Sequence, residues 1–373
     1  MKKILVTGAN GFIGRNVCAE LGRLKDDYIL FKADIDTDET TLDNYIGDCD
    51  FVVHLAGVNR PKNDGEFFSG NGGLTQQILK RLEEHKNTVP VAMTSSIQAE
   101  LDNLYGKSKL EAERAVLAYS KKNGAAGYVF RLPNVFGKWC RQNYNSAVAT
   151  FCYNIAHDIP IEVNAPERVM TLVYIDDVVE LIKKAIVGGL SVREDGYCDV
   201  PVTHDIKLAE IARKLLEFHD SRKTLIMPSL RDELDKELYS TYLSYLDTDA
   251  FSYPLEKKED SRGWLYEFIK SRDMGQFFVS KTKPGVTRGN HWHHTKVEKF
   301  LVISGEATIK FRKIDGGNII EYKVSGENPT PVDIPVGYTH SIKNTSDTKE
   351  LITLFWANEM FNPDKPDTYF LEV

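Results

Sequence analysis

The chain contains the stretch ILVTGANGFIG at residues 4–14, and this stretch decides the fold of its first half. Residues 4–6 are apolar and predict a strand, and residues 16–24 predict the helix that follows. Between them, one glycine permits a tight turn, a second lets the backbone approach a pyrophosphate, and a third lets the helix pack on the strand. The helix N-terminus then attracts phosphate. We therefore expect a dinucleotide to bind at Gly8, Asn10, Gly11, Phe12, Ile13 and Gly14.

Outward from this stretch, apolar runs alternate with helical patterns. Continuous apolar runs are typical of buried parallel strands, and they occur at residues 51–55, 89–93 and 128–132. Helical periodicity occurs at residues 104–122 and 176–186. Strands that alternate with helices predict an α/β fold of the Rossmann type, with a doubly wound parallel sheet.

The pattern changes after about residue 243. Residues 268–281, 299–314 and 318–324 look like strands, and glycine and proline separate them. Short strands with frequent turns predict an all-β antiparallel barrel or jelly roll. We place the first domain at residues 1–243, a linker at 244–252 and the second domain at 253–373.

The composition of the 373 residues narrows the classes of function. A net charge of −7 argues against a nucleic-acid-binding surface, which needs clustered Lys and Arg. No apolar run approaches the roughly 20 residues that cross a bilayer, so we expect no membrane partner. The five cysteines form no CxxC pair, which favours free thiols in a reducing cytoplasm over disulfides.

Tyr105 and Lys109 lie four residues apart within a predicted helix. Residues at i and i+4 share one helix face, so the phenol and the ammonium can act on one substrate atom. We expect the ammonium to lower the pKa of the tyrosine, which suits proton donation to a carbonyl oxygen as a hydride arrives at carbon. Ser96 follows a predicted strand and can hydrogen-bond the same oxygen. Ser96, Tyr105 and Lys109 are therefore the candidate catalytic residues.

Asp34 bears on the choice between NAD and NADP. It lies 20 residues after Gly14, where an acidic side chain can bind a ribose 2′-OH and repel a 2′-phosphate. Arg15 and Lys32 can instead pair with that phosphate. The residues alone leave both cofactors open.

The second domain contains the pattern His291-x-His293-x4-Glu298, and His340 lies further along the chain. Residues at i and i+2 of a strand point to the same side, so His291 and His293 can both face the barrel interior. Three imidazoles and a carboxylate suit a borderline divalent ion such as zinc, iron, manganese or nickel, of which we favour zinc. The candidate metal ligands are His291, His293, Glu298 and His340.

The first domain resembles the extended short-chain dehydrogenase/reductase family, whose members act on nucleotide sugars. The glycine stretch and the Tyr–Lys pair carry the resemblance, together with residues 54–57, 94–96, 131–137 and 173–178. It implies that Ser96, Tyr105 and Lys109 are catalytic and that Asn134 approaches the sugar nucleotide. It also implies that the cofactor is lined by Leu55, Ala56, Gly57, Tyr105 and Lys109, where Gly57 replaces a more usual alanine.

The second domain resembles the cupin family, through patterns at residues 285–305 and 335–344. This resemblance implies that the two histidines, the glutamate and the third histidine are metal ligands. Residues 260–268 and 285–291 also look like deoxysugar 3,5-epimerases, cupins in which the histidine after Arg-Gly-x abstracts a proton. His291 takes that position here, but as a metal ligand it is not free to be the base. Other candidate proton carriers are Lys296, Tyr338 and His294.

The whole chain resembles the bifunctional capsular polysaccharide synthesis enzymes of the UDP-N-acetyl-L-fucosamine pathway, through segments that include residues 136–140, 291–296 and 358–373. The resemblance implies that the cupin epimerises C3 of a UDP-2-acetamido-2,6-dideoxy-4-hexulose. The reductase domain then reduces C4 with NADPH to give UDP-2-acetamido-2,6-dideoxy-L-talose. The resemblance also implies a homodimer, and it favours NADPH although Asp34 keeps NADH open.

Two other functions fit the same residues. A metal-dependent oxygenase cupin fused to a reductase would bind iron and consume oxygen, but the epimerase-like Arg-Gly-x-His segment argues against it. A non-catalytic sensor of NADPH and a sugar nucleotide would not need the proton donor that Ser96, Tyr105 and Lys109 supply.

Overall fold

The computed structural model describes residues 1–373, which form two compact units. The first unit contains Met1–Leu215 and Glu233–Leu246, and the second contains Leu216–Asp232 and Asp247–Val373. The segment 216–232 groups with the second unit, which the sequence pattern does not indicate. The domain bounds drawn from the sequence stay a prediction. No helix combines the length and the apolar composition that a membrane span requires.

A parallel six-stranded sheet lies at the centre of the first unit, which confirms the predicted α/β fold. Its fourth strand continues to Ser96, three residues beyond the predicted end, so the serines lie at the end of a strand rather than after it. In spatial order the strands are β2 (Tyr28–Ala33), β1 (Lys2–Thr7), β3 (Phe51–His54), β4 (Val91–Ser96), β5 (Gly127–Leu132) and β8 (Tyr197–Cys198).

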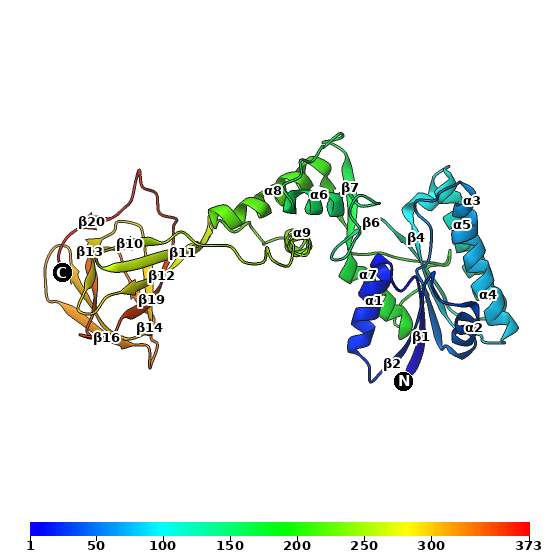
Figure 1. Ribbon diagram of the computed structural model, residues 1–373, viewed down its shortest axis with the longest axis horizontal. Helices are drawn as coiled ribbons and strands as arrows, with labels where there is room; N and C mark the ends of the chain where they lie inside the picture. The colour runs from blue at the N-terminus through cyan, green and yellow to red at the C-terminus, as the bar shows by residue number, and fades with distance from the viewer. The chain divides into compact units, whose positions relative to one another are not determined.

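Helices cover both faces of this sheet, as a doubly wound fold requires (Figure 1). Alternate residues of each strand point to opposite faces, so Ile4 and Val6 pack under one helix layer and Leu5 packs under the other. The first layer contains α1 (Phe12–Arg23) and α7 (Ile175–Ile186). The second contains α2 (Glu39–Asp48), α4 (Leu74–Glu84) and α5 (Leu104–Asn123).

A small three-stranded sheet completes the first unit. In it β6 (Asn134–Phe136) pairs in parallel with β7 (Val169–Tyr174), and β7 pairs antiparallel with β9 (His204–Lys207). The remaining helical segments of the chain are α3 (Gly65–Phe67), the π-helical turn η1 (Phe68–Gly73), the 3₁₀ turn η2 (Ile97–Glu100), α6 (Ala147–Ala156), α8 (Leu208–Thr224) and α9 (Glu233–Leu243).

Two antiparallel sheets of six and five strands form the second unit, which confirms the predicted all-β barrel. Their inner faces share one core, in which Phe300 and Phe355 of one sheet meet Ile309 and Ile342 of the other. One sheet has the order β10 (Lys258–Asp260), β11 (Gly263–Ser271), β12 (Gly275–Thr282), β19 (Leu351–Ala357), β14 (Glu298–Ser304) and β17 (Val332–Ile334). The other has the order β16 (Ile320–Ser325), β15 (Glu306–Lys313), β18 (Tyr338–Asn344), β13 (Thr287–Trp292) and β20 (Tyr369–Phe370).

Two of the long predicted strands are each a pair of strands. The segment 268–281 spans β11 and β12, with a turn that ends at Gly275, where φ is +74°. The segment 299–314 spans β14 and β15, which meet at Gly305, where φ is +89°. Glycine adopts such positive φ values at little cost, so the chain can reverse at each glycine inside a segment predicted to be one strand.

Candidate functional site

The glycine turn between β1 and α1 leaves space that any larger side chain would fill. A Cβ atom at Gly8, where φ is +67°, would lie 2.7 Å from the backbone nitrogen of Ala56. A Cβ atom at Gly14 would lie 2.0 Å from the carbonyl oxygen of Gly8. Helix α1 begins at Phe12 with no side-chain cap and no acidic residue in its first turn. The turn therefore fits the phosphates of a dinucleotide, which the uncapped helix N-terminus can bind.

Asp34 follows β2 and contacts this turn. Its Oδ2 atom accepts a hydrogen bond of 2.7 Å from the backbone N–H of Asn10, and its Oδ1 atom accepts one of 2.9 Å from Ile35. The Arg15 guanidinium lies 4.8 Å from the ring centre of Trp139. The structure thus places an acidic residue and a basic residue close to the same turn, and the choice between NAD and NADP stays a prediction.

The end of β3 lies beside the end of β1, because Thr7 and His54 are partners in the register of the two strands. His54 is buried, and its ring nitrogens contact the hydroxyls of Thr7 at 2.7 Å and Thr75 at 2.9 Å. Burial, with Lys109 nearby, lowers the pKa of His54 to about 3, so the imidazole is neutral. His54 therefore ties two strands to α4, and this position brings Leu55, Ala56 and Gly57 up to the glycine turn.

Gly57, the departure from the family pattern, has a local explanation. A Cβ atom there would lie 2.7 Å from Oδ1 of Asn71 and 3.1 Å from Nζ of Lys109. Asn71 cannot easily yield, because its amide hydrogen-bonds both backbone groups of Val58 at 2.9 and 3.0 Å and the Ser108 hydroxyl at 2.9 Å. No motif in the sequence indicates Asn71, which lies in the π-helical turn η1, a type of turn that is frequent at functional sites.

Ser96, Tyr105 and Lys109 converge at the carboxyl end of β4. The Tyr105 hydroxyl lies close enough to the side chain of Ser96 for that side chain to lower the pKa of Tyr105. Lys109 is 7% exposed, and its ammonium donates a hydrogen bond of 3.4 Å to the carbonyl of Thr94. The structure thus brings the three candidate catalytic side chains to one place, while their roles in catalysis stay a prediction.

The pKa of Tyr105 differs from the sequence-based expectation. Burial raises the pKa of Tyr105 to about 12, and the hydrogen bond with Ser96 only partly offsets this. Burial also lowers the pKa of Lys109 to about 8, against the opposing charge of Glu113. The predicted lowering of the tyrosine pKa by Lys109 is therefore wrong for this state, because desolvation outweighs charge attraction. A phenol that keeps its proton is still the form that can donate one.

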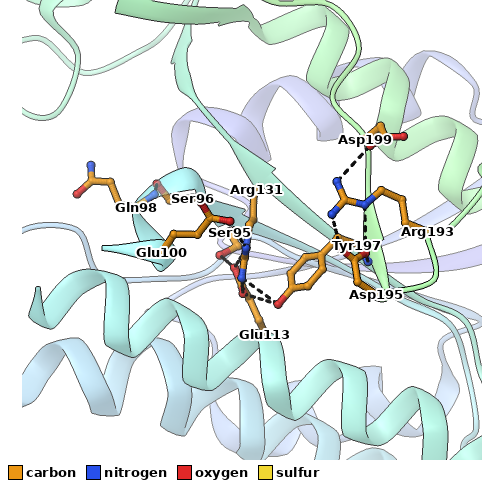
Figure 2. A network of polar contacts seen from close by, with 10 residues as sticks. All are labelled: Ser95, Ser96, Gln98, Glu100, Glu113, Arg131, Arg193, Asp195, Tyr197 and Asp199. Carbon is orange, nitrogen blue, oxygen red and sulfur yellow. Dashed lines mark hydrogen bonds and ion pairs between the residues drawn. The ribbon is translucent and has the colours of Figure 1, made fainter. Parts of the chain in front are cut away.

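A polar network around the Glu113 carboxylate includes Ser95, the neighbour of Ser96 on β4 (Figure 2). Glu113 lies one helical turn after Lys109 on α5 and is completely buried. Its carboxylate accepts hydrogen bonds from Ser95 at 2.5 Å, from Arg131 at 2.7 Å and from the Tyr197 hydroxyl at 3.0 Å. The sequence analysis missed this network, although the position of Glu113, four residues after Lys109, places it on the same helix face.

Asn134 and an aromatic–cation cluster lie in the same unit. The Asn134 side chain donates a hydrogen bond of 3.0 Å to the carbonyl of Thr171, so it joins β6 to β7. The Tyr144 ring has the guanidinium groups of Arg60 and Arg141 over it, at 5.5 and 5.2 Å. Tyr144 is close enough to Tyr105 to raise its pKa further. Two guanidinium groups therefore share an aromatic ring that lies near the candidate proton donor.

The four candidate metal ligands meet inside the barrel. Their ligand atoms all lie within 4.8 Å of one another. β13 carries His291, β18 carries His340, and Glu298 begins β14, whereas His293 lies one residue beyond β13 rather than within it. In the register of the two strands, His291 is opposite His340.

The chemistry of this cluster fits a divalent cation. Nε2 of His293 and both ring nitrogens of His340 are buried without a hydrogen-bond partner, which is costly unless something else binds them. Burial lowers the pKa of His291 to about 4. Although burial opposes the charge on Glu298, contacts with His293 and His340 hold the pKa of its carboxyl well below the usual range. Neutral imidazoles and an ionised carboxylate are the forms that bind metals such as zinc.

The other candidate proton carriers of the barrel have different surroundings. The Lys296 ammonium donates hydrogen bonds to Thr368 Oγ1 at 2.7 Å and to the carbonyl of Pro366 at 3.2 Å, so the tail of the chain holds it. His294 packs edge-on against the rings of Trp292 and Tyr369. Tyr338 is half-buried at the start of β18, next to the barrel core.

Comparisons with known proteins cover both units. Residues 4–189 match the NAD dependent epimerase/dehydratase family, and residues 258–369 match the polysaccharide biosynthesis C-terminal domain. The chain is 46% identical over 375 residues to UDP-2-acetamido-2,6-beta-L-arabino-hexul-4-ose reductase of Pseudomonas aeruginosa, covering 100% of this chain and 99% of that protein.

Solved structures agree with this match. The crystal structure of the capsular polysaccharide assembling protein CapF from Staphylococcus aureus superimposes with a TM-score of 0.93 at 48% identity, covering 99% of this chain and 100% of that one. UDP-glucuronic acid 4-epimerase from Bacillus cereus superimposes with a TM-score of 0.54 at 17% identity, covering 65% of this chain and 98% of that one. The second likeness shows a shared fold.

Proposed function

Because the chain belongs to the family of capsular polysaccharide synthesis enzymes that join an epimerase/dehydratase domain to a polysaccharide biosynthesis C-terminal domain, we propose that it is a bifunctional nucleotide-sugar enzyme. In this proposal the barrel epimerises C3 of a UDP-2-acetamido-2,6-dideoxy-4-hexulose. The first unit then reduces C4 and releases UDP-2-acetamido-2,6-dideoxy-L-talose. NADPH as the reductant, zinc in the barrel and a homodimeric assembly are parts of the same proposal.

The observation that carries the proposal is the convergence of Ser96, Tyr105 and Lys109 at the edge of the sheet where the glycine turn also lies. Parallel α/β sheets bind their ligands at the carboxyl ends of the strands, so cofactor and proton donor belong to one site. A protein that only sensed these ligands would have no use for a buried lysine whose pKa is lowered to about 8.

The reduction assigns a role to each of the three side chains. NADPH, when bound, supplies the hydride that C4 receives. Tyr105 donates its hydroxyl proton to the C4 oxygen as negative charge develops there, and Ser96 hydrogen-bonds the same oxygen. Lys109 in its ammonium form offers positive charge to the phenolate that remains. The phenolate regains its proton from solvent before the next turnover.

The epimerisation uses the acidity that the 4-keto group gives to C3. A base removes the C3 proton, the electron pair delocalises onto the C4 oxygen, and a proton returns to the opposite face of C3. A divalent cation held by His291, His293, Glu298 and His340 supplies positive charge inside the barrel. Two of the candidate proton carriers differ in their surroundings. Tyr338 packs against the barrel core, whereas the Lys296 ammonium donates a hydrogen bond to Thr368 of the C-terminal tail.

The two arginines that contact Tyr144 suit an anionic substrate. Arg60 and Arg141 are exposed and share the ring of Tyr144, which lies near the proton donor. Guanidinium groups are well matched to the diphosphate of a UDP-sugar. Together with the uncapped start of α1, which suits the cofactor phosphates, they provide separate places for two phosphorylated molecules.

A direct test incubates the purified protein with the UDP-4-keto-sugar and either NADPH or NADH, and follows cofactor absorbance and product by mass spectrometry. We expect one molecule of cofactor to be oxidised for each molecule of product formed. The rate of oxidation should be higher with NADPH than with NADH. A strong preference for NADH would assign Asp34 to the ribose 2′-OH and overturn the NADPH part alone. Absence of cofactor oxidation would overturn the reductase assignment.

A further inference from the structure

The C-terminal tail lies directly against the turn that carries the metal ligands. Strand β20 pairs antiparallel with β13, so that Phe370 lies opposite His291 and Tyr369 lies opposite Trp292. The N–H of Leu371 donates a hydrogen bond of 3.0 Å to the carbonyl of Asn290. The tail is thus an edge strand of the sheet that contains two of the four candidate ligands.

One carboxylate of this tail organises the turn between His293 and Glu298. The side chain of Asp367 accepts hydrogen bonds from three consecutive backbone N–H groups and from the Thr295 hydroxyl at 3.1 Å. The three backbone donors, at 3.0, 2.9 and 2.9 Å, belong to His294, Thr295 and Lys296. The turn is therefore wrapped around a single carboxylate.

The backbone of Asp367 contacts a ligand directly. Its carbonyl oxygen accepts a hydrogen bond of 2.6 Å from Nδ1 of His293. A carbonyl can only accept, so Nδ1 carries the proton and Nε2 is the free lone pair. Nε2 lies 3.5 Å from Oε2 of Glu298 and is buried without a hydrogen-bond partner. The carbonyl thus fixes both the tautomer and the direction of this ring.

The backbone of Asp367 is also strained. Its φ is +39°, in a region that residues with a side chain rarely adopt. Such conformations are costly and persist only where surrounding contacts impose them. Here the carboxylate of Asp367 binds the backbone of residues 294–296, and the carbonyl of the same residue binds His293 next to them. The strained conformation lets one residue make both contacts.

We propose that Asp367 is a positioning residue for the metal site: it holds His293 with Nε2 toward the cation and sets the spacing between His293 and Glu298. The proposal rests on the proposed metal site. In known sites, partners that hydrogen-bond a ligating histidine contribute about 10–100-fold to metal affinity. Asp367 lies 74 residues from His293 in the chain, so the tail of the protein controls the metal affinity of the barrel.

The test compares full-length Asp367→Ala and Asp367→Asn with the matched control Asp364→Ala, which removes an exposed carboxylate of the same tail. Zinc affinity is measured by competition with a chromophoric chelator. Asp367→Ala keeps the carbonyl but removes the carboxylate that holds the tail against the turn, so the carbonyl is no longer held against His293. We expect this variant to bind zinc more weakly, by up to about 10–100-fold, and Asp364→Ala to bind as the wild type does. Asp367→Asn, which retains one acceptor oxygen, should fall between them and serves as the test if the alanine variant does not fold.

A second measurement separates positioning from general loosening of the barrel. Nitrogen-15 NMR of the metal-free protein reports which ring nitrogen of each histidine carries the proton. We expect His293 to be held as the Nδ1–H tautomer in the wild type. In folded Asp367→Ala it should become a mixture, because the lost carboxylate no longer keeps the tail carbonyl against the ring. Unchanged zinc affinity and an unchanged tautomer would overturn the proposal. If the wild type and His293→Ala both fail to bind zinc, the metal site itself is wrong, which is a different result.

Discussion

The hydroxyl of Ser95 donates a hydrogen bond of 2.5 Å to the carboxylate of Glu113, and this contact fastens the end of β4 to α5. The neighbouring residue on the strand is Ser96, and the same face of the helix carries Tyr105 and Lys109. One buried carboxylate therefore joins the two elements that bear the proposed proton donor and its partners. Arg131, bonded to the same carboxylate, balances its charge (Figure 2).

Removal of this carboxylate should destabilise the first unit. Glu113→Ala leaves Ser95 and the Tyr197 hydroxyl without their buried acceptor, whereas Arg131 keeps an ion pair with Glu100 at 2.7 Å. Leaving a buried hydrogen-bonding group without its partner costs about 1–3 kcal/mol. Urea unfolding should show a loss of this size, whereas Lys122→Ala, which breaks an exposed pair with Glu83, should cost less than about 1 kcal/mol. Equal losses for both variants would contradict the account.

The substitution Tyr105→Phe should separate the two proposed activities. Phenylalanine keeps the ring but removes the proton that the C4 oxygen receives, so reduction should fall by about 100-fold or more. Exchange of the C3 proton with solvent should continue, because it is assigned to the barrel. Loss of both activities in a folded variant would argue against separate sites.

The pH dependence of reduction should follow Lys109. Its pKa is lowered to about 8, so the ammonium form disappears as pH rises through that value, and kcat/KM should fall above about pH 8. The charge of Glu113 raises the pKa of Lys109, so Glu113→Gln should move the decline to lower pH. A wild-type profile that stays level well above pH 8, or a decline that Glu113→Gln moves upward, would be inconsistent with this assignment.

A second buried carboxylate should make stability depend on pH. Glu237 is 6% exposed, and its Oε2 atom lies 3.3 Å from Nε2 of His204. Burial, with the charge of Asp177 and then of Glu233 and Asp176, raises the pKa of Glu237 from 4.5 to about 7. Because the folded-state pKa is the higher one, the protonated form favours folding. That contribution is complete below the unfolded-state value and is lost as pH rises through about 7.

Glu237→Gln should therefore stabilise the protein at neutral and alkaline pH, because the amide stands in for the protonated acid. We expect a gain of about 2 kcal/mol in the free energy of unfolding above about pH 8, which shrinks toward zero near pH 4. Chemical unfolding at a series of pH values measures it. A variant less stable than the wild type at every pH would show that ionised Glu237 has a favourable partner.

The sequence predicts those features that short-range geometry determines. The glycine spacing at residues 8–14 defines a turn in which the backbone approaches so closely that only glycine fits. His291, His293 and Glu298 lie within eight consecutive residues, so their ligand atoms come together where two neighbouring strands meet. Tyr105 and Lys109 follow from the period of a helix. In each of these cases, the residues that form the site lie close together in the sequence, or are spaced by one turn of a helix.

The features that the sequence does not predict depend on long-range packing. Glu113 meets Arg131 because α5 packs beside β5, and Asp367 meets His293 because the tail pairs with β13. The pKa of Tyr105 depends on its burial, which the Tyr–Lys spacing does not reveal. The turns at Gly275 and Gly305 lie inside segments that the sequence pattern treats as single strands, because strands continue on both sides of each turn.

The most direct test of two chemistries in one chain is proton NMR of the UDP-4-keto-sugar in deuterated water, with zinc-loaded enzyme and without NADPH. We predict that the H3 signal disappears as deuterium enters C3, that the ketone persists, and that later addition of NADPH converts it to the alcohol. An H3 signal that stays intact until NADPH is added, followed by reduction without inversion at C3, would contradict the account.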